Sequence, residues 1–276
     1  MINTVPASPT VKARVSVRAM VDAEKSNDLV DRLRRREPLI GYWVATDNPV
    51  ATERIASVGY DYVCLDMQHG LIGFAGMVAN VIATDAGGSS SVVRVGANDP
   101  ALIGRALDAG ARAVIVPLVN TAEEAAAAVA ACRYQPGGIR SFGPSRAPLR
   151  VGAGDVASVD AAVACIVMIE TAAGLANVDA ICSTPGLDGV YIGPSDLSIA
   201  LGAPRAGAVA DLPAFDEGLV GVRAAAERAG IACGMHCTSG EVAAARLAEG
   251  FTYASISSDL LHLETAARAH LDAARA

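Results

Sequence analysis

The sequence predicts a single-domain (β/α)8 TIM barrel, an α/β fold, and three observations lead to it. Eight apolar runs alternate with amphipathic, alanine-rich segments from residue 39 onward. Near-continuous apolarity in such runs is typical of parallel strands that are covered on both faces. The length of 276 residues is one that a barrel of this kind commonly fills alone.

The expected strands follow one another at fairly regular intervals along the chain. In order they are residues 39–46, 61–66, 91–95, 113–119, 164–170, 188–193, 231–236 and 252–257. Eight strand–helix units fit a closed barrel better than an open sheet. The rival fold is a doubly wound sheet. If it bound a dinucleotide, it would need a glycine-rich phosphate loop after the first strand, and residues 43–50 contain no glycine.

Helix start and stop signals occupy the segments between the strands. Start signals precede four of them: Asn48-Pro49, Asp99-Pro100, Thr121 and Thr238-Ser239. Glycine, which readily adopts the left-handed conformation that ends many helices, follows four: Gly59, Gly110, Gly230 and Gly250. An N-terminal helix near residues 21–36 and a final helix from about residue 260 would cover the ends of the barrel.

The domain organisation follows from these elements. We expect residues 21–276 to form one barrel domain and residues 1–20 to form a flexible tail. The first 21 residues contain no acidic side chain, so a transit peptide is the alternative reading of the tail. The N-terminus lacks the apolar segment of a secretory signal.

Charge and hydropathy argue against nucleic-acid and membrane partners. The net charge is −7, and the only basic cluster lies within residues 32–36, whereas phosphate neutralisation needs a broad positive surface. No stretch approaches the roughly 18 uninterrupted apolar residues of a membrane span. The six cysteines show no regular framework, which favours reduced thiols and a cytoplasmic location.

A concentration of polar side chains ends the second expected strand, in V-C-L-D-M-Q-H-G (63–70). Asp66, Gln68 and His69 stand where a buried strand has no structural need of them. The catalytic groups of barrel enzymes lie at the carboxyl ends of the strands. These residues are therefore candidates for an active site, although His69 taken alone could be a hydrogen-bonded structural residue.

Charged residues end other strands as well. Arg94 ends the third strand, Glu170 ends the fifth, and Asp196 follows the sixth. Taken singly, Glu170 could be an ion-pair partner of Arg94, and Asp196 could favour a helix N-terminus. Two acids buried together instead favour a divalent cation with oxygen ligands between them, which suits Mg²⁺ or Mn²⁺.

Cysteine and lysine positions narrow the chemistry further. The segment C-G-M-H-C (233–237) has no partner pair of metal-ligand spacing elsewhere. This favours core packing over a zinc site, with His236 lining a pocket.

The only lysines, Lys12 and Lys25, precede the first strand. No barrel residue can therefore form a Schiff base, and carbon–carbon bond chemistry here would depend on a metal.

Six motifs occur in a specific order along the chain. They are L-D-M-Q-H-G (65–70), V-V-R-V-G-A-N-D-P (92–100), L-D-A-G (107–110), R-Y-Q-P-G-G-I-R (133–140), V-M-I-E-T (167–171) and G-V-Y-I-G-P-S-D-L-S (189–198). Together they resemble the HpcH/HpaI aldolase/citrate lyase family, specifically its class II pyruvate aldolases, over residues 38–260. The resemblance implies a metal-dependent lyase that cleaves 4-hydroxy-2-oxo acids to pyruvate, or a related 2-oxo acid, and an aldehyde.

The resemblance also implies roles for individual residues. Glu170 and Asp196 would bind the divalent ion (Mg²⁺, Mn²⁺ or Co²⁺), which the 2-oxo acid would chelate. Arg94 would contact the ketone oxygen and stabilise the enolate. His69 would be the acid/base, and Asp66 would hold its ring in the working tautomer.

Further implied roles concern substrate binding. Backbone groups around Gly193, Pro194 and Ser195 would cradle the substrate carboxylate beside a helix N-terminus. Gln68, where many relatives have Glu, would influence substrate binding and preference. Apart from the resemblance, the long loop before the fifth strand (141–154) is expected to line the mouth of the pocket. Arg146 or Arg150 could meet an acidic aldehyde there, and the alternative is that they are solvated loop arginines.

Assembly is the last property that the resemblance implies. Asp108 would reach the active site of a neighbouring subunit in a homo-oligomer, a hexamer built as a trimer of dimers. The C-terminal helix would be exchanged between subunits, and its apolar residues are compatible with burial against a partner.

Three other functions stay open at the level of sequence. A CoA-ester lyase acting on citramalyl- or malyl-like thioesters would use the same metal site, but the barrel has no basic cluster for an adenine nucleotide. An oxaloacetate-type decarboxylase would pass through the same enolate. A non-catalytic binding barrel would be expected to lose the charged strand ends, which this chain keeps.

Overall fold

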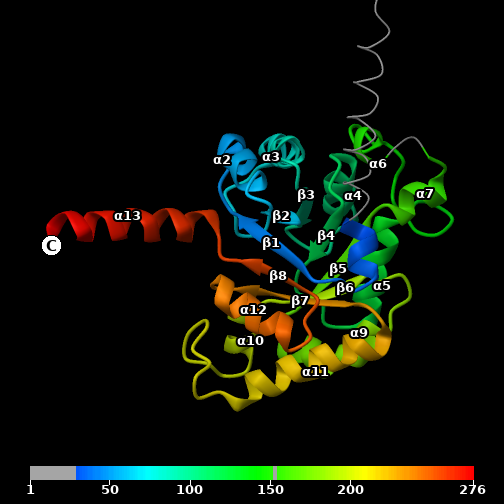
Figure 1. Cartoon of the computed structure of the whole chain (residues 1–276). Coiled ribbons are helices and arrows are strands. Elements are labelled where there is room, and N and C mark those ends of the chain that lie inside the picture. Colours follow the sequence, from blue (N-terminus) through cyan, green and yellow to red (C-terminus); the bar gives the residue numbers. More distant parts are fainter. Residues whose placement is uncertain (1–28, 152–153) are drawn as a thin grey trace, which may run out of the picture.

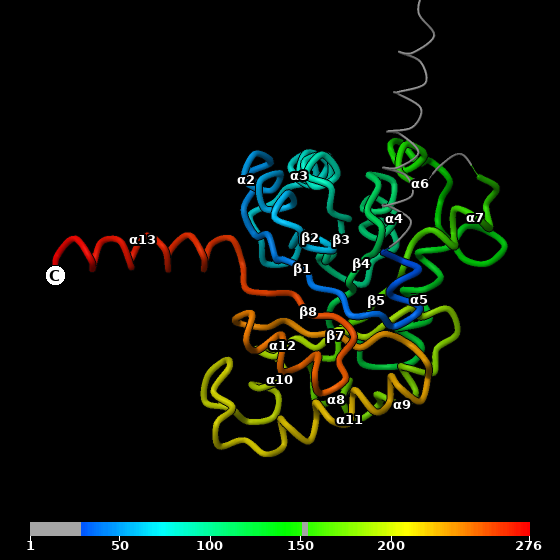
Figure 2. Tube along the Cα trace, viewed as in Figure 1, coloured from blue at the N-terminus to red at the C-terminus, as the bar shows by residue number. Residues whose placement is uncertain are grey.

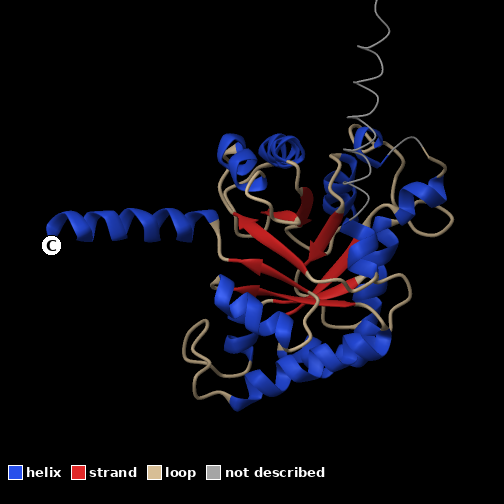
Figure 3. Ribbon diagram, viewed as in Figure 1, coloured by secondary structure: helices blue, strands red, loops and turns tan. Residues whose placement is uncertain are grey.

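Eight parallel strands close into a barrel in sequence order, β1 through β8 and back to β1, with helices on the outside (Figure 3). The structure, a computed structural model, describes residues 29–151 and 154–276. The expected tail and the first part of the expected N-terminal helix lie outside these ranges. The predicted (β/α)8 barrel is confirmed, and each of the eight expected strands is present.

Each strand ends within a few residues of its expected bounds. The strands are β1 (Leu39–Val44), β2 (Tyr62–Asp66), β3 (Ser90–Arg94), β4 (Ala113–Val116), β5 (Ala164–Ile169), β6 (Gly189–Ile192), β7 (Ala232–Cys237) and β8 (Tyr253–Ile256). The helices are α2 (Pro49–Ala56), α3 (Phe74–Gly87), α4 (Pro100–Asp108), α5 (Ala122–Cys132), α6 (Pro148–Val151), α7 (Val156–Ala161), α8 (Ala172–Ala176), α9 (Val178–Cys182), α10 (Pro194–Ala200), α11 (Pro213–Ala229), α12 (Gly240–Ala248) and α13 (Asp259–Arg275).

The expected helix signals act as local physics requires. At each of the four expected N-termini a side chain accepts a hydrogen bond from a first-turn backbone N–H, namely Asn48, Asp99, Thr121 and Ser239. The four expected stop glycines all adopt positive φ, between 72° and 115°. Strand positions along the sequence are therefore set by signals that the chain carries locally.

Alternate residues of each strand point into the barrel, where tyrosines fill the centre. Tyr62 and Tyr253 are buried there, and glycines on adjacent strands leave them room. A Cβ at Gly41 would lie 2.1 Å from the Tyr62 ring, and a Cβ at Gly234 would lie 2.4 Å from the Tyr253 ring. Tyr191 packs beside Tyr253 with ring centroids 5.9 Å apart. These rings close the barrel beneath its carboxyl-terminal mouth.

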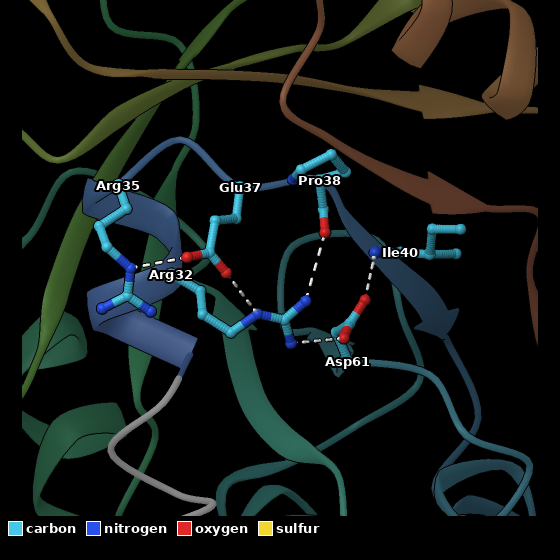
Figure 4. A network of polar contacts seen from close by, with 6 residues as sticks. All are labelled: Arg32, Arg35, Glu37, Pro38, Ile40 and Asp61. Carbon is cyan, nitrogen blue, oxygen red and sulfur yellow. Dashed lines mark hydrogen bonds and ion pairs between the residues drawn. The ribbon is translucent and has the colours of Figure 1, made fainter.

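The opposite end of the barrel is covered by the described part of the N-terminal helix. Its apolar side chains are buried against the interior: Leu29, Val30 and Leu33. Arg32 bonds the Glu37 carboxylate at 3.2 Å and Asp61 at 2.7 Å, while Arg35 also bonds Glu37 (Figure 4). Arg34 pairs with Asp188 at 2.7 Å. Three arginines of the basic cluster noted in the sequence, Arg32, Arg34 and Arg35, thus form ion pairs within the chain.

Helix α13 projects away from the barrel and ends at the C-terminus, far from every other helix (Figures 1 and 2). None of its residues is buried. Its first turn is attached at the barrel mouth, where the Asp259 carboxylate accepts from the backbone N–H groups of Ala45 (2.9 Å) and Thr46 (3.0 Å). The Tyr42 hydroxyl also lies 2.9 Å from Nδ1 of His262. The rest of the helix has no barrel surface to cover.

Two further features bear on the environment of the chain. All six cysteines are buried and carry free thiols. Within residues 29–151 and 154–276, no helix has the length and apolar character needed to cross a membrane.

Candidate active site

A pocket of about 300 Å³ opens at the carboxyl ends of the strands. Seven residues predicted from the sequence line it, contributed by β2, β3 and the β6–α10 turn: Asp66, His69, Arg94, Gly193, Pro194, Ser195 and Asp196. His236 also lines it, as expected. The closed barrel brings together residues that are up to 215 positions apart in the sequence, from Trp43 to Ser258.

Asp66 and Arg94 form a buried ion pair at one wall of the pocket. They are register partners on β2 and β3, and the Asp66 carboxylate accepts from Nε (2.9 Å) and Nη2 (2.5 Å) of Arg94. Burial by itself would raise the pKa of Asp66, but the bonds and charge of Arg94 and the amides of His69 and Gln68 bring it below its usual value. Both side chains are therefore charged and held in one orientation.

His69 lies at the mouth of the pocket with an exposed side chain. Its backbone N–H donates to Oδ1 of Asp66 at 3.1 Å, and the N–H of Gln68 donates to the same oxygen at 3.0 Å. We expected Asp66 to hold the imidazole ring, whereas its contact to His69 is through the backbone. The carboxylate is occupied by Arg94, so it orients the turn that carries His69 instead of the ring.

Trp43, the only tryptophan in the chain, joins the elements of this wall. Its Nε1 donates to Oδ2 of Asp66 at 3.2 Å, and the guanidinium of Arg94 lies 4.9 Å from its ring centroid. Its ring also stacks against Tyr191 at 5.7 Å and meets His236 edge-on at 5.4 Å. Trp43 was not predicted as a site residue from the sequence. The signal that could have found it is its position in β1, since alternate residues of this strand point into the barrel and Trp43 is one of them.

Glu170 and Asp196 bring two carboxylates to the β5–β6 side of the site. Glu170 is buried, and its Oε1 accepts from the backbone N–H of Leu118 at 2.8 Å. Burial raises the pKa of Glu170, and the negative charge of Asp196 raises it further. A Cβ at position 193 would lie 2.5 Å from Oε2 of Glu170, so Gly193 leaves the room that this carboxylate occupies.

Of the alternative structural roles, an ion pair of Glu170 with Arg94 receives little support, whereas Asp196 does occupy the first turn of α10, where an acid favours the helix N-terminus. Arg94 forms its ion pair with Asp66. The N-cap of α10 is Gly193, and Asp196 stands in the first helical turn with an exposed side chain that lines the pocket. Both acids are thus placed beside the pocket by backbone geometry.

The segment 233–237 packs as the core-packing interpretation requires. Cys233 and Cys237 are buried in the outer core between strands and helices, whereas His236 points into the barrel. Burial lowers the pKa of His236 to about 4, assisted by the positive charge of Arg94.

Comparison with known proteins identifies the family to which this chain belongs. The sequence model of the family described as HpcH/HpaI aldolase/citrate lyase matches residues 39–266. The chain belongs to the HpcH/HpaI aldolase/citrate lyase family. It is a carbon–carbon lyase of the aldolase type, as the ordered motifs predicted, and metal dependence is general in this family.

Three similar proteins illustrate the range of the HpcH/HpaI family. A hydroxypyruvate/pyruvate aldolase of Rhizorhabdus wittichii is 41% identical over 242 residues, which cover 87% of this chain and 95% of that protein. A 2-dehydro-3,6-dideoxy-6-sulfogluconate aldolase of Pseudomonas putida is 35% identical over 83% of this chain and 89% of that one. The crystal structure of a family protein from Burkholderia cenocepacia J2315 superposes with a TM-score of 0.82 at 33% identity, and covers 91% of this chain and all of that one.

The carboxylate pair of this HpcH/HpaI protein fits a divalent cation with oxygen ligands. Within the described ranges, no three His, Cys, Asp or Glu side chains form a complete metal cage. Mg²⁺ is commonly held by one or two carboxylates together with water and substrate oxygens. Glu170 and Asp196 match that donor set. A cation would offset both the burial and the repulsion by Asp196 that raise the pKa of Glu170.

Three residues expected at the site do not line this pocket. One is Glu170, which lies beside the lining residue Gly193 of the pocket. Gln68 does not line it, and within the described part of the chain its buried Oε1 has no hydrogen-bond partner. Asp108 is the last residue of α4, a helix that runs back toward the amino ends of the strands, and it pairs with Arg140 at 2.7 Å. Asp108 therefore lies away from the pocket of its own chain.

The expectation for the loop before β5 was wrong. Arg146 and Arg150 both pair with Asp85, near the C-terminus of α3, at 2.5 and 3.1 Å. The backbone N–H of Arg146 donates to the carbonyl of Asp108. A loop that precedes a strand lies at the amino end of a barrel, so these arginines lie away from the pocket of their own chain.

Proposed function

We propose that this protein is a class II aldolase that cleaves 4-hydroxy-2-oxo acids to pyruvate, or a closely related 2-oxo acid, and an aldehyde. One observation carries the proposal: a rigid arginine, an exposed histidine and the Asp196 carboxylate line a single pocket, and the Glu170 carboxylate lies directly behind Gly193, another of its lining residues. These are the groups that enolate formation requires.

The substrate class is inferred from the pocket and from the relatives. The 41% identical relative is named for hydroxypyruvate and pyruvate, and the 35% identical one for a sulfo-sugar acid. We infer a 2-oxo acid donor of three carbons and a short polar aldehyde. The pocket volume of about 300 Å³ supports small substrates.

The divalent ion, Mg²⁺, Mn²⁺ or Co²⁺, would be held by Glu170 and Asp196. When bound, it supplies Lewis-acid polarisation of the 2-oxo acid and a positive charge beside its oxygens. Both carboxylates must be ionised to bind it. The N-terminal turn of α10, residues 193–195, would bind the substrate carboxylate through its backbone N–H groups.

Arg94 and His69 would perform the remaining steps. Asp66 occupies Nε and Nη2 of Arg94, so the guanidinium is fixed before substrate arrives and its charge stabilises the developing negative charge on the ketone oxygen. In cleavage, His69 takes the proton of the C4 hydroxyl, the C3–C4 bond breaks, and its electron pair forms the enolate as the aldehyde leaves. A proton then returns to C3 to give the 2-oxo acid.

Assembly into a homo-oligomer, in the family's hexameric form, forms part of the proposal. Four leucines of α13 are 45–69% exposed in the single chain, and Leu263 and Leu271 lie on one face two helical turns apart. A partner barrel that buries this face would account for a helix that covers nothing of its own chain. In such an assembly Asp108 would act on the site of a neighbouring subunit.

The test requires no knowledge of the aldehyde. The protein is incubated with pyruvate in heavy water, and loss of the methyl proton signal is followed by NMR with Mg²⁺, Mn²⁺, Co²⁺ or excess EDTA. We expect exchange with at least one ion and none with EDTA. Absence of exchange with every ion would refute a pyruvate donor, and oxaloacetate and CoA thioesters would then be tested as donors.

A further inference from the structure

We propose that His236 binds a substrate hydroxyl group on the carbon next to the reacting carbonyl. A 3-hydroxy-2-oxo acid donor carries such a hydroxyl, and so does a 2-hydroxyaldehyde acceptor. The inference rests on the proposed aldolase function and specifies which aldol substrates the pocket prefers. His236 is a binding residue in this proposal and takes no part in proton transfer.

The position of His236 places its ring inside the pocket. It is the fifth residue of β7 and is paired in register with Ser255 of β8. Its strand neighbours Met235 and Cys237 are buried in the outer core. The imidazole therefore points to the interior, where it lines the same pocket as Arg94 and Asp196.

The orientation of the ring is held by its surroundings. Trp43 contacts it edge-on, with ring centroids 5.4 Å apart and planes at 81°. Trp43 is itself fixed by its hydrogen bond to Asp66 and by its stacking on Tyr191. A ring that is already held in place loses little conformational entropy when it binds a ligand.

The hydrogen-bonding groups of His236 are available to a ligand. In residues 29–151 and 154–276, its ring takes part in no protein hydrogen bond, and Trp43 packs against it edge-on. A buried or half-buried polar group of this kind ordinarily has a partner. The ring of His236 is open to the pocket, where a substrate hydroxyl can take the place of water as its partner.

The chemistry of the ring selects a hydroxyl over a charged group. Burial lowers the pKa of His236 to about 4, with a further contribution from Arg94, so the imidazole is neutral at pH 7. A neutral imidazole offers one donor and one acceptor, and a hydroxyl group can use either. A substrate carboxylate would instead favour the cationic Arg94 or backbone N–H groups.

The experiment compares matched substrate pairs in the direction of aldol addition with Mn²⁺. One arm compares hydroxypyruvate with pyruvate as donor, with glyoxylate as the common acceptor. The other arm compares glycolaldehyde with acetaldehyde as acceptor, with pyruvate as the common donor. The unmodified enzyme is assayed beside His236→Phe, which removes the hydrogen bond, and His236→Gln, which retains one. His270→Gln, on exposed α13, is the matched control.

We expect His236→Phe to lower the ratio of kcat/KM for the hydroxylated substrate to that for its deoxy counterpart by roughly tenfold, the effect of one hydrogen bond. The arm in which the ratio falls identifies whether donor or acceptor carries the bound hydroxyl. His236→Gln should recover most of the ratio, and His270→Gln should leave it unchanged. Two results would overturn the proposal. One is a kcat/KM ratio that is unchanged by His236→Phe in both arms, and the other is a ratio that falls equally in His236→Gln and His236→Phe.

A second measurement uses the unmodified enzyme alone. The chain has four histidines, so the imidazole ¹H–¹⁵N signals of His236 can be assigned by substitution. We expect them to shift with the hydroxylated member of a pair and not with its deoxy counterpart; identical shifts contradict the proposal. Failure of the two proposals can be told apart. If the unmodified enzyme turns over none of the substrate pairs, the aldolase function is contradicted, whereas turnover with a ratio that His236→Phe does not alter contradicts only the role of His236.

Discussion

Asp66 holds the guanidinium of Arg94 through two hydrogen bonds, at 2.9 Å to Nε and 2.5 Å to Nη2. The two residues are register partners on adjacent strands, so the barrel's own hydrogen bonding brings them together. Asp66 also accepts from Trp43 and from two backbone amides of the turn that carries His69. The Asp66 carboxylate thus connects two groups of the proposed mechanism. One is the Arg94 guanidinium, which would stabilise the enolate, and the other is the turn that carries His69, which would move the proton.

Removing this carboxylate should cost stability as well as activity. In Asp66→Ala the buried Arg94 loses its partner, and we expect the free energy of unfolding to fall by about 3–5 kcal/mol. Urea unfolding measures this directly. Asp179→Ala is the matched control, because its partner Arg228 is 61% exposed and such surface pairs contribute about 1 kcal/mol or less. Equal losses in the two variants would contradict a special role for the buried pair.

The carboxylate pair should govern metal binding. Mn²⁺ at saturating concentration should raise the Tm of the unmodified protein, because a ligand that binds only the folded state stabilises it. Glu170→Gln and Asp196→Asn keep the side-chain shape but remove one charge each, and should lose most of that rise. Differential scanning fluorimetry with and without Mn²⁺ provides the measurement. A full rise in both variants would place the ion elsewhere.

The imidazole at position 236 should make the protein sensitive to acid. Its folded pKa is about 4, below the ordinary 6.5, so the unfolded chain binds the proton more readily. Stability from this group is complete above pH 6.5 and is lost as the pH falls toward 4, by about 3 kcal/mol at most. Denaturant unfolding at pH 7 and pH 4.5 should show a smaller loss for His236→Phe than for the unmodified chain. A loss of equal size would mean that His236 titrates normally.

Loss of the mouth histidine should separate chemistry from binding. His69→Ala should slow aldol cleavage by at least about 100-fold, the usual effect of removing an acid/base group. Binding of Mn²⁺, followed by electron paramagnetic resonance, should be unchanged, because His69 is not among the proposed ligands. His270→Ala on exposed α13 serves as control. Unaltered turnover in His69→Ala would remove its proposed role.

The projecting helix should determine the oligomeric state. Leu263→Glu combined with Leu271→Glu places two charges on the exposed apolar face of α13, and we expect the assembly to dissociate into smaller species. Sedimentation velocity reports the change in mass. Val58→Glu, at an apolar site that is 73% exposed outside α13, is the control. A monomeric unmodified protein would contradict the assembly proposal outright.

The sequence by itself determined the barrel and most of the pocket. Caps such as Asn48 and stop glycines such as Gly110 act within a few residues of themselves, so they can be recognised without a structure. Strand ends carry the same kind of local information. In a closed parallel barrel every strand delivers its last inward side chain to one face, which is why Arg94 and His236 could be assigned to a common site.

The tertiary structure decided which of these groups contact one another. The partner of the Asp66 carboxylate is Arg94, 28 positions away, although a histidine stands three positions away. Trp43 became part of the site only through contacts with four other strands. Such choices depend on side-chain packing and charge in a low-dielectric interior, where one carboxylate satisfies the nearest buried cation first, and sequence spacing carries no measure of those distances.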